Sequence, residues 1–388
     1  MIIIEKPYVS ELLIDTIVQN DWLVLDNEVV KNSNVEEGAI RIVDEETAKT
    51  FYSNITNPLV YSNSENAIKW FTANIPDSNF SKLLNMFKDK ILYRKTFQEL
   101  YSDFKYQEVK FEDLTKLKLE DLEFPFVIKP AEGFMGVGVH IINDDKDWRA
   151  TLPALKEEME RAKAIFTENV INSSRFILEK YIEGEEFAID AYYNSEGKPV
   201  ILNIFQHPFV NSKDVKNRIY VTSKGIIANY INRFTNLLKQ MGEIIEIRNL
   251  AMHMEVRITA NGEIIPIEVN PIRFSGWCTT DVAKYAWGIN VYEYYFNQLK
   301  PDWNQILQKV SNSAYYFSIA EIPDGVDRNK IKTIDYNKFL ANYSEVIELR
   351  RINPKNNPIF AIIFGKTKDK EEIQKILQIK TKDYITLS

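Results

Sequence analysis

The stretch HMEVRITANGEIIPIEVNP, residues 253–271, decides the fold, because it has the pattern of two β-strands joined by a tight turn. Asn261-Gly262 is the strongest short hairpin signal and lies between two β-like runs. Counting back from a two-residue turn places Glu255 opposite Glu268. One face of the hairpin is then wholly apolar, which supports this register. The apolar face holds Met254, Val256, Ile258, Ile265, Ile267 and Val269, and the other face holds His253, Glu255, Arg257, Glu268 and Asn270.

The same count places Ile258 opposite Ile265 and Ala260 opposite Glu263. Pro266 complicates it, because proline cannot donate a hydrogen bond to the strand ladder. A bulge next to Pro266 would shift the register of the hairpin.

The opposed glutamates need a counter-charge, because like charges about 5 Å apart on neighbouring strands repel each other. A divalent cation would supply it. Carboxylate oxygens of Glu255 and Glu268, with the amide oxygen of Asn270, are hard ligands that suit Mg²⁺ better than zinc. The alternative is a solvated strand face on which Arg257 neutralises the two acids.

A glycine-rich segment lies between two apolar runs in FPFVIKPAEGFMGVGVHII, residues 124–142. Gly133, Gly136 and Gly138 would let backbone N–H groups approach a phosphate, which Lys129 could also reach. Strands flank the segment on both sides, which excludes a P-loop or a dinucleotide-binding turn, since these lead into a helix. The alternative is an ordinary hairpin loop beside a surface lysine.

The remaining pattern predicts further strands and helices. We expect a helix from about 145 to 170, then strands over 175–182 and 185–193 separated by Glu183-Gly184. A strand over 199–207 follows, and an amphipathic helix over 225–242 has Gly242 where a helix would be capped. After residue 301 the sequence predicts a small α+β lobe with the strands AYYFSIAEI and NPIFAIIFG and a closing helix, KDKEEIQKIL.

The composition is that of an ordinary globular protein of 388 residues, with 45% hydrophobic and 27% charged side chains. The net charge of -7 and the lack of a basic cluster argue against nucleic acid as a partner. No apolar stretch approaches the length of a membrane span, and residues 1–13 lack a signal-peptide pattern, so we expect no membrane and a cytoplasmic location. Cys278 is the single cysteine and three histidines are scattered, which excludes an intrachain disulfide and a thiolate zinc site.

Three segments together resemble the core motifs of the ATP-grasp superfamily, which includes D-alanine:D-alanine ligase, biotin carboxylase and carbamoyl phosphate synthetase. They are FPFVIKPAEGFMGVGVHII, FILEKYIEGEEFAID and MHMEVRITANGEIIPIEVNP, in this order. The resemblance covers roughly residues 85–300. It implies an α/β and α+β chain with the ATP-grasp fold, in which two antiparallel sheet lobes enclose ATP. The implied parts are an N-terminal α/β domain (1–85), a small lobe (86–185), a large lobe with the metal site (186–300) and a C-terminal α+β lobe (301–388).

The resemblance also assigns roles to single residues. Lys129 is similar to the strand lysine that meets the α- and β-phosphates, and Lys90 to an earlier nucleotide-binding lysine. Arg273 would reach the transferred phosphoryl group or acyl phosphate, although Ile272 separates it from the EVNP run that it directly follows in many members. The implied nucleotide-binding residues are Lys90, Lys129, Gly133, Gly136, Gly138, Glu179, Lys180, Ile182 and Glu186; the metal ligands are Glu255, Glu268 and Asn270; the catalytic residues are Lys129 and Arg273.

The implied activity is that of an ATP-dependent ligase, with small-molecule substrates and with ATP and one or two Mg²⁺ ions, or Mn²⁺, as cofactors. A carboxylate would be activated as an acyl phosphate and passed to an amine, for which we expect an amino acid or small peptide. A bicarbonate, formate or thiol substrate, a hydroxyl acceptor, and a non-catalytic nucleotide-binding protein are the alternatives, and a homodimer stays open. Cys278 is expected to be a packed residue. Proximity in sequence suggests His207, Lys213, Arg218, Tyr220 and residues 273–277 as substrate contacts.

Overall fold

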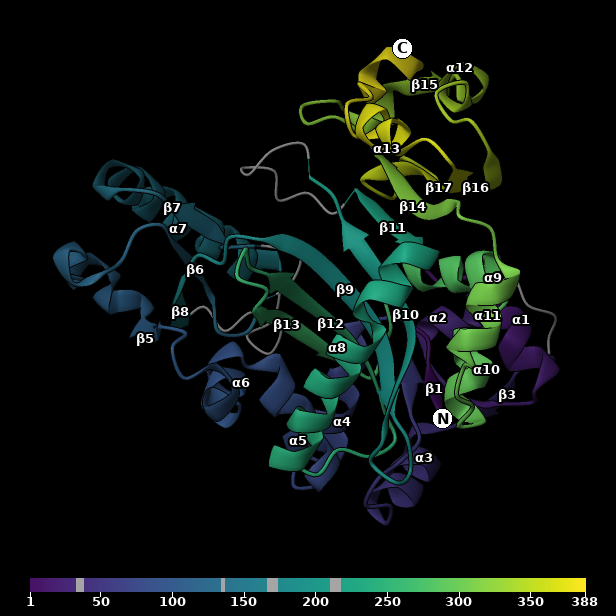
Figure 1. The fold of residues 1–388 in the computed structure, drawn as a ribbon, viewed down its shortest axis with the longest axis horizontal. Helices are drawn as coiled ribbons and strands as arrows, with labels where there is room; N and C mark the ends of the chain where they lie inside the picture. Colours follow the sequence, from purple (N-terminus) through teal and green to yellow (C-terminus); the bar gives the residue numbers. More distant parts are fainter. Residues whose placement is uncertain (33–37, 134–136, 166–173, 210–217) are drawn as a thin grey trace.

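The computed structural model describes residues 1–32, 38–133, 137–165, 174–209 and 218–388 (Figure 1). The N-terminal part is an α/β unit, as the sequence predicts, and the structure shows its four strands to be parallel, in the order β3-β2-β1-β4. Its strands are β1 (Ile2–Ile3), β2 (Leu23–Leu25), β3 (Arg41–Val43) and β4 (Tyr61–Ser62), and its helices are α1 (Glu11–Gln19), α2 (Glu28–Lys31), α3 (Glu45–Ser53), α4 (Ile68–Asn74) and α5 (Asn79–Lys88).

The small lobe is a four-stranded antiparallel sheet in the order β5-β8-β6-β7. The predicted hairpin around the glycine segment is confirmed, since Phe126 pairs with Ile142 and Ile128 with His140. The predicted helix after it begins at Asp145, and the residues beyond 165 in that prediction lie outside the described chain. The elements are α6 (Lys90–Thr96), β5 (Tyr106–Lys110), β6 (Phe126–Pro130), β7 (His140–Ile142), α7 (Asp145–Ile165) and β8 (Arg175–Lys180).

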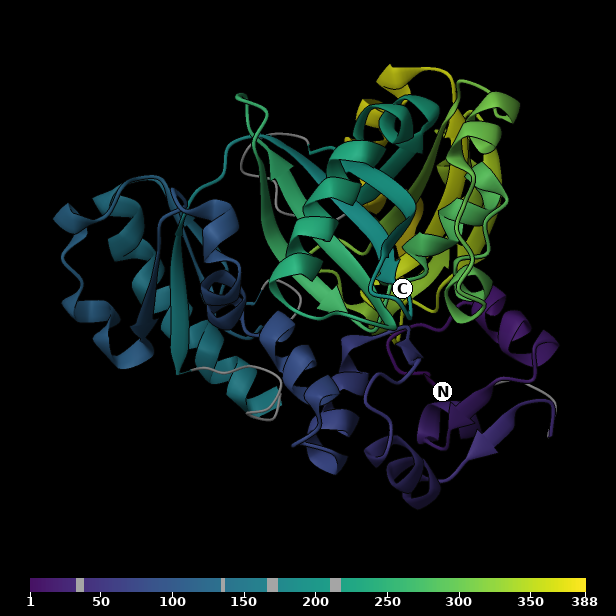
Figure 2. The same cartoon turned by 60° about the horizontal axis from the view of Figure 1, so that its bottom comes forward.

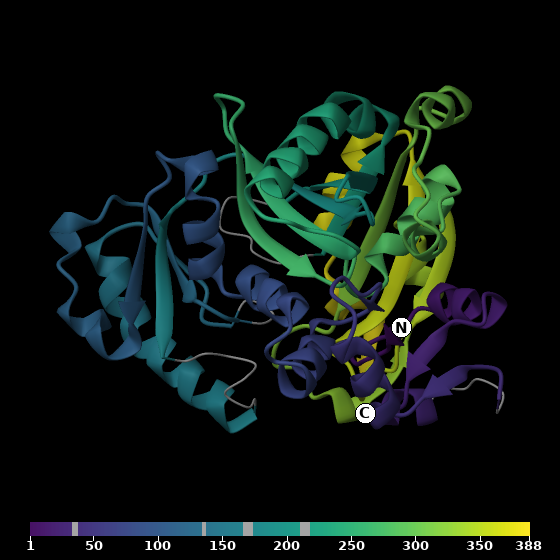
Figure 3. The ribbon, with the colours of Figure 1, turned by 90° about the horizontal axis from the view of Figure 1, so that it is seen from below.

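The large lobe is built on an eight-stranded antiparallel sheet in the order β13-β12-β9-β10-β11-β14-β17-β16. Its last three strands come from the C-terminal part, so the α+β segment after residue 301 extends the large sheet. Figures 2 and 3 show the small lobe to one side of this sheet and the N-terminal unit against one end of it. The strands are β9 (Glu185–Tyr193), β10 (Pro199–His207), β11 (Ile219–Ser223), β12 (Leu250–Ile258), β13 (Ile264–Pro271), β14 (Ala314–Glu321), β16 (Val346–Arg351) and β17 (Ile359–Thr367).

Helices cover the large sheet and its C-terminal extension. The amphipathic helix α8 packs on β10, but it runs past Gly242, where the sequence predicted its cap. Gly242 is therefore inside the helix. A Cβ there would lie 3.2 Å from the ring of Tyr193, so the glycine permits close packing of the helix on this ring. The helices are α8 (Lys224–Ile244), α9 (Val282–Trp287), α10 (Val291–Phe296), α11 (Trp303–Lys309), α12 (Tyr336–Leu340) and α13 (Lys370–Leu377); a small two-stranded sheet joins β15 (Ile331–Ile334) and β18 (Ile385–Leu387). None of the helices in the described ranges is long and apolar enough to span a membrane.

The β12–β13 hairpin forms, but its turn is longer than predicted. Thr259 and Glu263 are joined by a backbone hydrogen bond, and Ile258 pairs with Ile264 where the sequence predicted Ile265. A bulge next to Pro266 then shifts the ladder by one residue and places Glu255 opposite Glu268, as predicted.

The longer turn also changes which face one apolar residue occupies. Ile265 pairs with Arg257 and therefore lies on the polar face, whereas we had assigned it to the core face. Beyond the bulge the predicted register holds, and Met254 and Val269 are an opposed buried pair on the core face.

The chain passes between the lobes through residues 181–184, and Gly184 ends this hinge in close contact with β12. A Cβ at position 184 would lie 2.2 Å from the carbonyl oxygen of Ile258, which belongs to the backbone and cannot move aside freely. We predict that Gly184→Ala lowers the free energy of unfolding by about 1–3 kcal/mol. Thermal or urea unfolding followed by circular dichroism measures it.

Gly225→Ala is the matched control. Gly225 lies in the first turn of α8, and the nearest atom to its missing Cβ is 3.8 Å away. The alanine should leave stability unchanged or raise it by up to about 1 kcal/mol. Equal stability of wild type and Gly184→Ala would contradict the close approach at the hinge.

Candidate active site

The register of the large sheet gathers a polar cluster on one face. Directly paired residues of an antiparallel sheet point to the same side. Glu255 pairs with Glu268 and His253 with both Asn270 and Asp190, while Glu186 pairs with Arg257 and His207. The polar face therefore holds Glu186 and Asp190 of β9, His207 of β10, His253, Glu255 and Arg257 of β12, and Glu268 and Asn270 of β13.

The predicted metal ligands lie together at one end of this face. The side chains of Glu255 and Glu268 are 20% and 30% exposed, so a ligand can approach both, and Asn270 is buried beside them. In the described parts of the chain no group of three or more His, Cys, Asp or Glu side chains could hold a metal ion. The candidate site thus consists of two carboxylates and one amide, a donor set that fits Mg²⁺.

His253 fixes one of the two glutamates. Its Nε2 lies 3.3 Å from Glu255 Oε1, and its Nδ1 lies 2.8 Å from Asp190 Oδ1. The backbone N–H and the hydroxyl of Ser275 also donate to Asp190. Burial lowers the pKa of His253, but hydrogen bonds to Asp190 and Glu255 outweigh it and raise the pKa to about 9.

Asp190 was missed as a site residue by the sequence reasoning. The signal was present, because Asp190 follows Glu186 by four residues in one strand and so faces the same side of the sheet. We had assigned a role only to Glu186.

Lys129 is part of a buried charge cluster in the small lobe. Its Nζ lies 2.5 Å from Glu179 Oε2, and Arg94 Nε donates to Glu179 Oε1 at 2.6 Å. Burial raises the pKa of Glu179, but the two cations outweigh it and lower the pKa to about 2. Burial also lowers the pKa of Lys129, an effect that Glu179 opposes. The side chain of Glu179 therefore serves as the counter-charge of Lys129.

Lys90 connects the two lobes. Its Nζ forms an ion pair with Glu268 Oε2 at 3.7 Å, and its backbone N–H donates to Ala131 O, next to the glycine segment. Lys90 is 9% exposed. The structure thus brings a predicted nucleotide-binding lysine to a predicted metal ligand.

The predicted nucleotide-binding residues in and next to the hinge are placed differently from one another. Lys180 has an exposed side chain, and its backbone N–H donates to Lys105 O. The carbonyl of Ile182 accepts from Arg257. Glu186 is buried and accepts from His207 and Arg257. Burial raises the pKa of Glu186, and these two partners reverse the shift and hold it below its ordinary value.

Arg273 turns toward the N-terminal unit. Its guanidinium binds Glu65 Oε1 through NH2 at 2.6 Å and Nε at 3.2 Å, and NH1 donates to Phe274 O. Glu65 also pairs with Lys88, whose ammonium donates to the carbonyl of Gly133. Sequence reasoning assigned no chemistry to the first 85 residues and so missed Glu65.

The other predicted residues divide into three groups. On the polar face, His207 and Tyr220 stack with their ring centroids 4.5 Å apart. Trp277 stacks on Tyr8 with a distance of 6.3 Å between ring centroids. Gly138 has a positive φ and packs against Pro130 and Met159. Gly136 and Lys213 lie outside the described residues.

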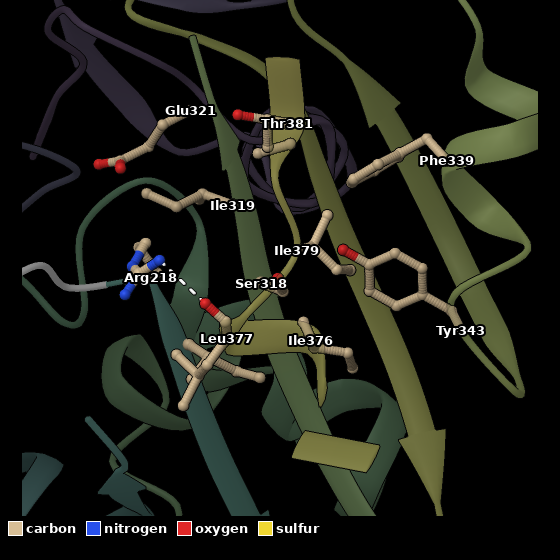
Figure 4. Close-up of a pocket in the computed structure, with 12 residues that line it drawn as sticks. Arg218, Ser318, Ile319, Glu321, Phe339, Tyr343, Ile376, Leu377, Ile379 and Thr381 are labelled. Carbon is tan, nitrogen blue, oxygen red and sulfur yellow. Dashed lines mark hydrogen bonds between the residues drawn. The ribbon is translucent and has the colours of Figure 1, made fainter. Parts of the chain in front are cut away.

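Arg218 is not at the polar face, which corrects our prediction of a substrate contact. Its NH1 donates to the carbonyl of Leu377 at the end of α13, in a cavity of about 60 Å³ against α12 and α13 (Figure 4). Proximity in sequence misled here, because Arg218 precedes β11 and points to the C-terminal helices. Cys278 is buried, as expected for a packed residue, and burial raises the pKa of its thiol.

The comparison with protein families matches residues 122–281 to the ATP-grasp domain. These residues include the glycine segment, the hinge and the strands β12 and β13. This part of the chain is therefore an ATP-grasp domain, and the predicted ATP-grasp fold is confirmed.

Solved structures extend the likeness in fold to the whole chain. The L-amino acid ligase from Bacillus licheniformis has a TM-score of 0.67 at 16% identity, over 100% of this chain and 98% of that chain. The N5-carboxyaminoimidazole ribonucleotide synthetase from Thermotoga maritima has a TM-score of 0.63 at 16% identity, over 100% and 98%. The biotin carboxylase domain of 2-oxoglutarate carboxylase from Hydrogenobacter thermophilus, in complex with MgADP and bicarbonate, has a TM-score of 0.61 at 11% identity, over 94% and 86%. The comparison with curated proteins gave no match.

The charge cluster around Lys129 generates a prediction about stability. Glu179→Gln leaves two buried cations without their counter-charge, which should lower the free energy of unfolding by about 3–5 kcal/mol at pH 7. The carboxylate contributes fully above its ordinary pKa of 4.5, and this contribution is lost as the pH falls toward 2. The difference in the free energy of unfolding between wild type and Glu179→Gln should therefore become smaller below about pH 4.5, as measured by urea unfolding.

Glu123→Gln is the control for this prediction, because Glu123 is an exposed carboxylate that pairs with Lys105. Its loss should change stability by less than about 1 kcal/mol. A pH-independent difference between wild type and Glu179→Gln would contradict an ionised Glu179.

Proposed function

We propose that this chain is an ATP-dependent ligase that activates a carboxylate as an acyl phosphate and passes it to an amine. The observation that carries the proposal is the opposed pair Glu255 and Glu268, open to ligands and joined through Lys90 to the small lobe. A face that combines two carboxylates with an amide, opposite lysines of a second lobe, suits the binding of a metal-bound polyphosphate.

Glu255, Glu268 and Asn270 would hold the metal, with one or two Mg²⁺ ions. The ion would neutralise phosphate charge when bound. His253 keeps Glu255 oriented through its contacts with Asp190, as outer partners of metal ligands commonly do. The Mg²⁺–ADP complex of a protein with the same fold supports this choice of metal.

The nucleotide would lie between the polar face and the small lobe. Lys129 and Lys90 would meet the phosphates, with backbone groups near Gly133 and Gly138. Glu179 and Lys180 at the end of β8 and Ile182 in the hinge would hold the adenine, and Glu186 would hold the ribose. Ile265 supports this placement, because the bulged register puts an apolar side chain on the polar face beside Arg257.

The chemistry would proceed in two transfers. A carboxylate oxygen of the first substrate attacks the γ-phosphorus of ATP, the bond to the β–γ bridging oxygen breaks, and ADP leaves. The amine then attacks the acyl carbon, phosphate leaves with the bonding electrons, and the nitrogen loses a proton. Arg273 would meet the transferred phosphoryl group, since a planar guanidinium suits such an oxyanion.

An amino acid or small peptide is our proposal for the amine. The stacked rings of Tyr8 and Trp277, which are both partly exposed, offer apolar surface for a side chain. The shared fold with an L-amino acid ligase favours this class. Bicarbonate activation is the second candidate, which the shared fold with a biotin carboxylase domain favours.

The direct test is ADP and phosphate release from Mg²⁺–ATP by the purified protein, with carboxylates and amines offered singly and in pairs. ADP formation that needs one carboxylate and one amine together is the expected result. ADP formation with bicarbonate alone would support the second candidate, and AMP as the product would rule out the acyl phosphate route.

Replacement of one metal ligand tests the site. We predict that Glu268→Gln lowers Mg²⁺-dependent turnover by about 100-fold or more, because the neutral amide binds a cation poorly. The fold should be intact by circular dichroism, since Glu268 is partly exposed. Glu263→Gln, on the exposed turn of the same hairpin, is the control and should turn over at the wild-type rate. Full activity of Glu268→Gln would remove the metal assignment.

A further inference from the structure

One carboxylate of the N-terminal unit holds two cations that belong to different parts of the chain. Glu65 Oε1 accepts from the guanidinium of Arg273, and Oε2 pairs with the ammonium of Lys88. The same ammonium donates to the carbonyl of Gly133 at 3.2 Å. A continuous chain of contacts therefore runs from Arg273 through Glu65 and Lys88 to the glycine segment.

Glu65 is buried and fully engaged. Its side chain is 8% exposed, and that of Arg273 is 13% exposed. Burial raises the pKa of Glu65, but Lys88 and Arg273 outweigh it and hold the pKa below its ordinary value. The carboxylate is therefore charged when it binds both cations, so its hydrogen bonds are of the stronger, charge-assisted kind.

The backbone just before Glu65 is hydrogen-bonded to Ile272, the residue before Arg273. The backbone N–H of Ser62, at the end of β4, donates to the carbonyl of Ile272 at 2.7 Å. Ile272 has a φ of 59°, a conformation that non-glycine residues seldom adopt. Tyr61 and Phe274 are in ring contact at 5.3 Å, on either side of this joint. The positions of Glu65 and Arg273 relative to each other are thus set by backbone and ring contacts as well as by charge.

We propose that Glu65 is a positioning residue, which aims Arg273 at the transferred phosphoryl group and holds Gly133 in place through Lys88. The inference rests on the proposed ligase function and adds to it a residue of the N-terminal unit. A guanidinium has five donors in a rigid plane. Glu65 occupies the Nε and NH2 side, and Phe274 O occupies NH1, so the plane is fixed before substrates bind.

If two residues act as one unit, changing either of them removes the same contribution to catalysis, and changing both removes no more. Glu65→Gln should lower kcat by about 10- to 100-fold, since a misplaced charged group costs about this much. Arg273→Lys should cost a similar factor, because lysine cannot reproduce the planar fork. The double variant should lie within about 2-fold of Arg273→Lys alone, whereas independent roles would multiply the two losses.

The experiment measures kcat and KM for ATP in wild type, both single variants and the double variant, with the substrate pair that supports ADP release. Glu348→Gln is the matched control. Its carboxylate likewise bridges two partners, Arg350 and Tyr285, but it lies on β16 at the opposite edge of the large sheet from β13. The control should keep kcat within about 2-fold of wild type. Glu65→Asp, which retains the charge, should recover part of the lost kcat and serves in place of Glu65→Gln if the latter does not fold.

Two results would overturn the inference: a kcat of Glu65→Gln within about 2-fold of wild type, or losses that multiply in the double variant. Absence of ADP formation by wild type would instead contradict the proposed ligase function. In that case the affinity for a non-hydrolysable ATP analogue with Mg²⁺, by calorimetry, decides the role of Glu65. Weakening by about 5-fold or more, without further loss in the double variant, would support it, and an unchanged affinity would reject it.

Discussion

Glu255 and Glu268 face each other across β12 and β13, where like charges repel unless a cation lies between or beside them. The protein supplies cations on both sides. His253 contacts Glu255, and Lys90 reaches Glu268 from the other lobe. The two cations reach the pair by different routes, because His253 lies on β12 with Glu255, whereas α6 of the small lobe brings Lys90 to Glu268.

The same balance explains how three parts of the chain are held together. Lys90 comes from the small lobe, and Glu65 reaches Arg273 from the N-terminal unit. The large-lobe partners in these contacts are Glu268 on β13 and Arg273 just after this strand, and both are within three residues of Asn270. The lobes therefore meet at residues that we propose for the active site. Phosphates that bind here would compete with carboxylates for Lys90, and the contact between lobes would change as they do so.

The sequence predicted the fold well wherever periodicity and turn signals were strong. The hairpin around the glycine segment and the opposed glutamates follow from local patterns, and the structure agrees. The predicted turn after Ile258 was one residue too short. The bulge beside Pro266 cancelled this error in register before Glu268. Alternation alone cannot locate a bulge, so Ile265 was assigned to the wrong face.

The contacts of Glu65 and Arg218 that sequence reasoning missed are made between distant segments. Glu65 and Arg273 are 208 positions apart, and no local pattern connects a short turn after β4 with the end of β13. Arg218 was misplaced for the same reason, since nearness in sequence to a site does not fix the direction of a side chain. A buried ionised carboxylate is costly unless it is paired, and Glu65 satisfies that requirement only in the assembled molecule. The N-terminal unit thus contributes to the proposed site through tertiary contacts. Such contacts leave no local motif in the sequence of residues 1–85.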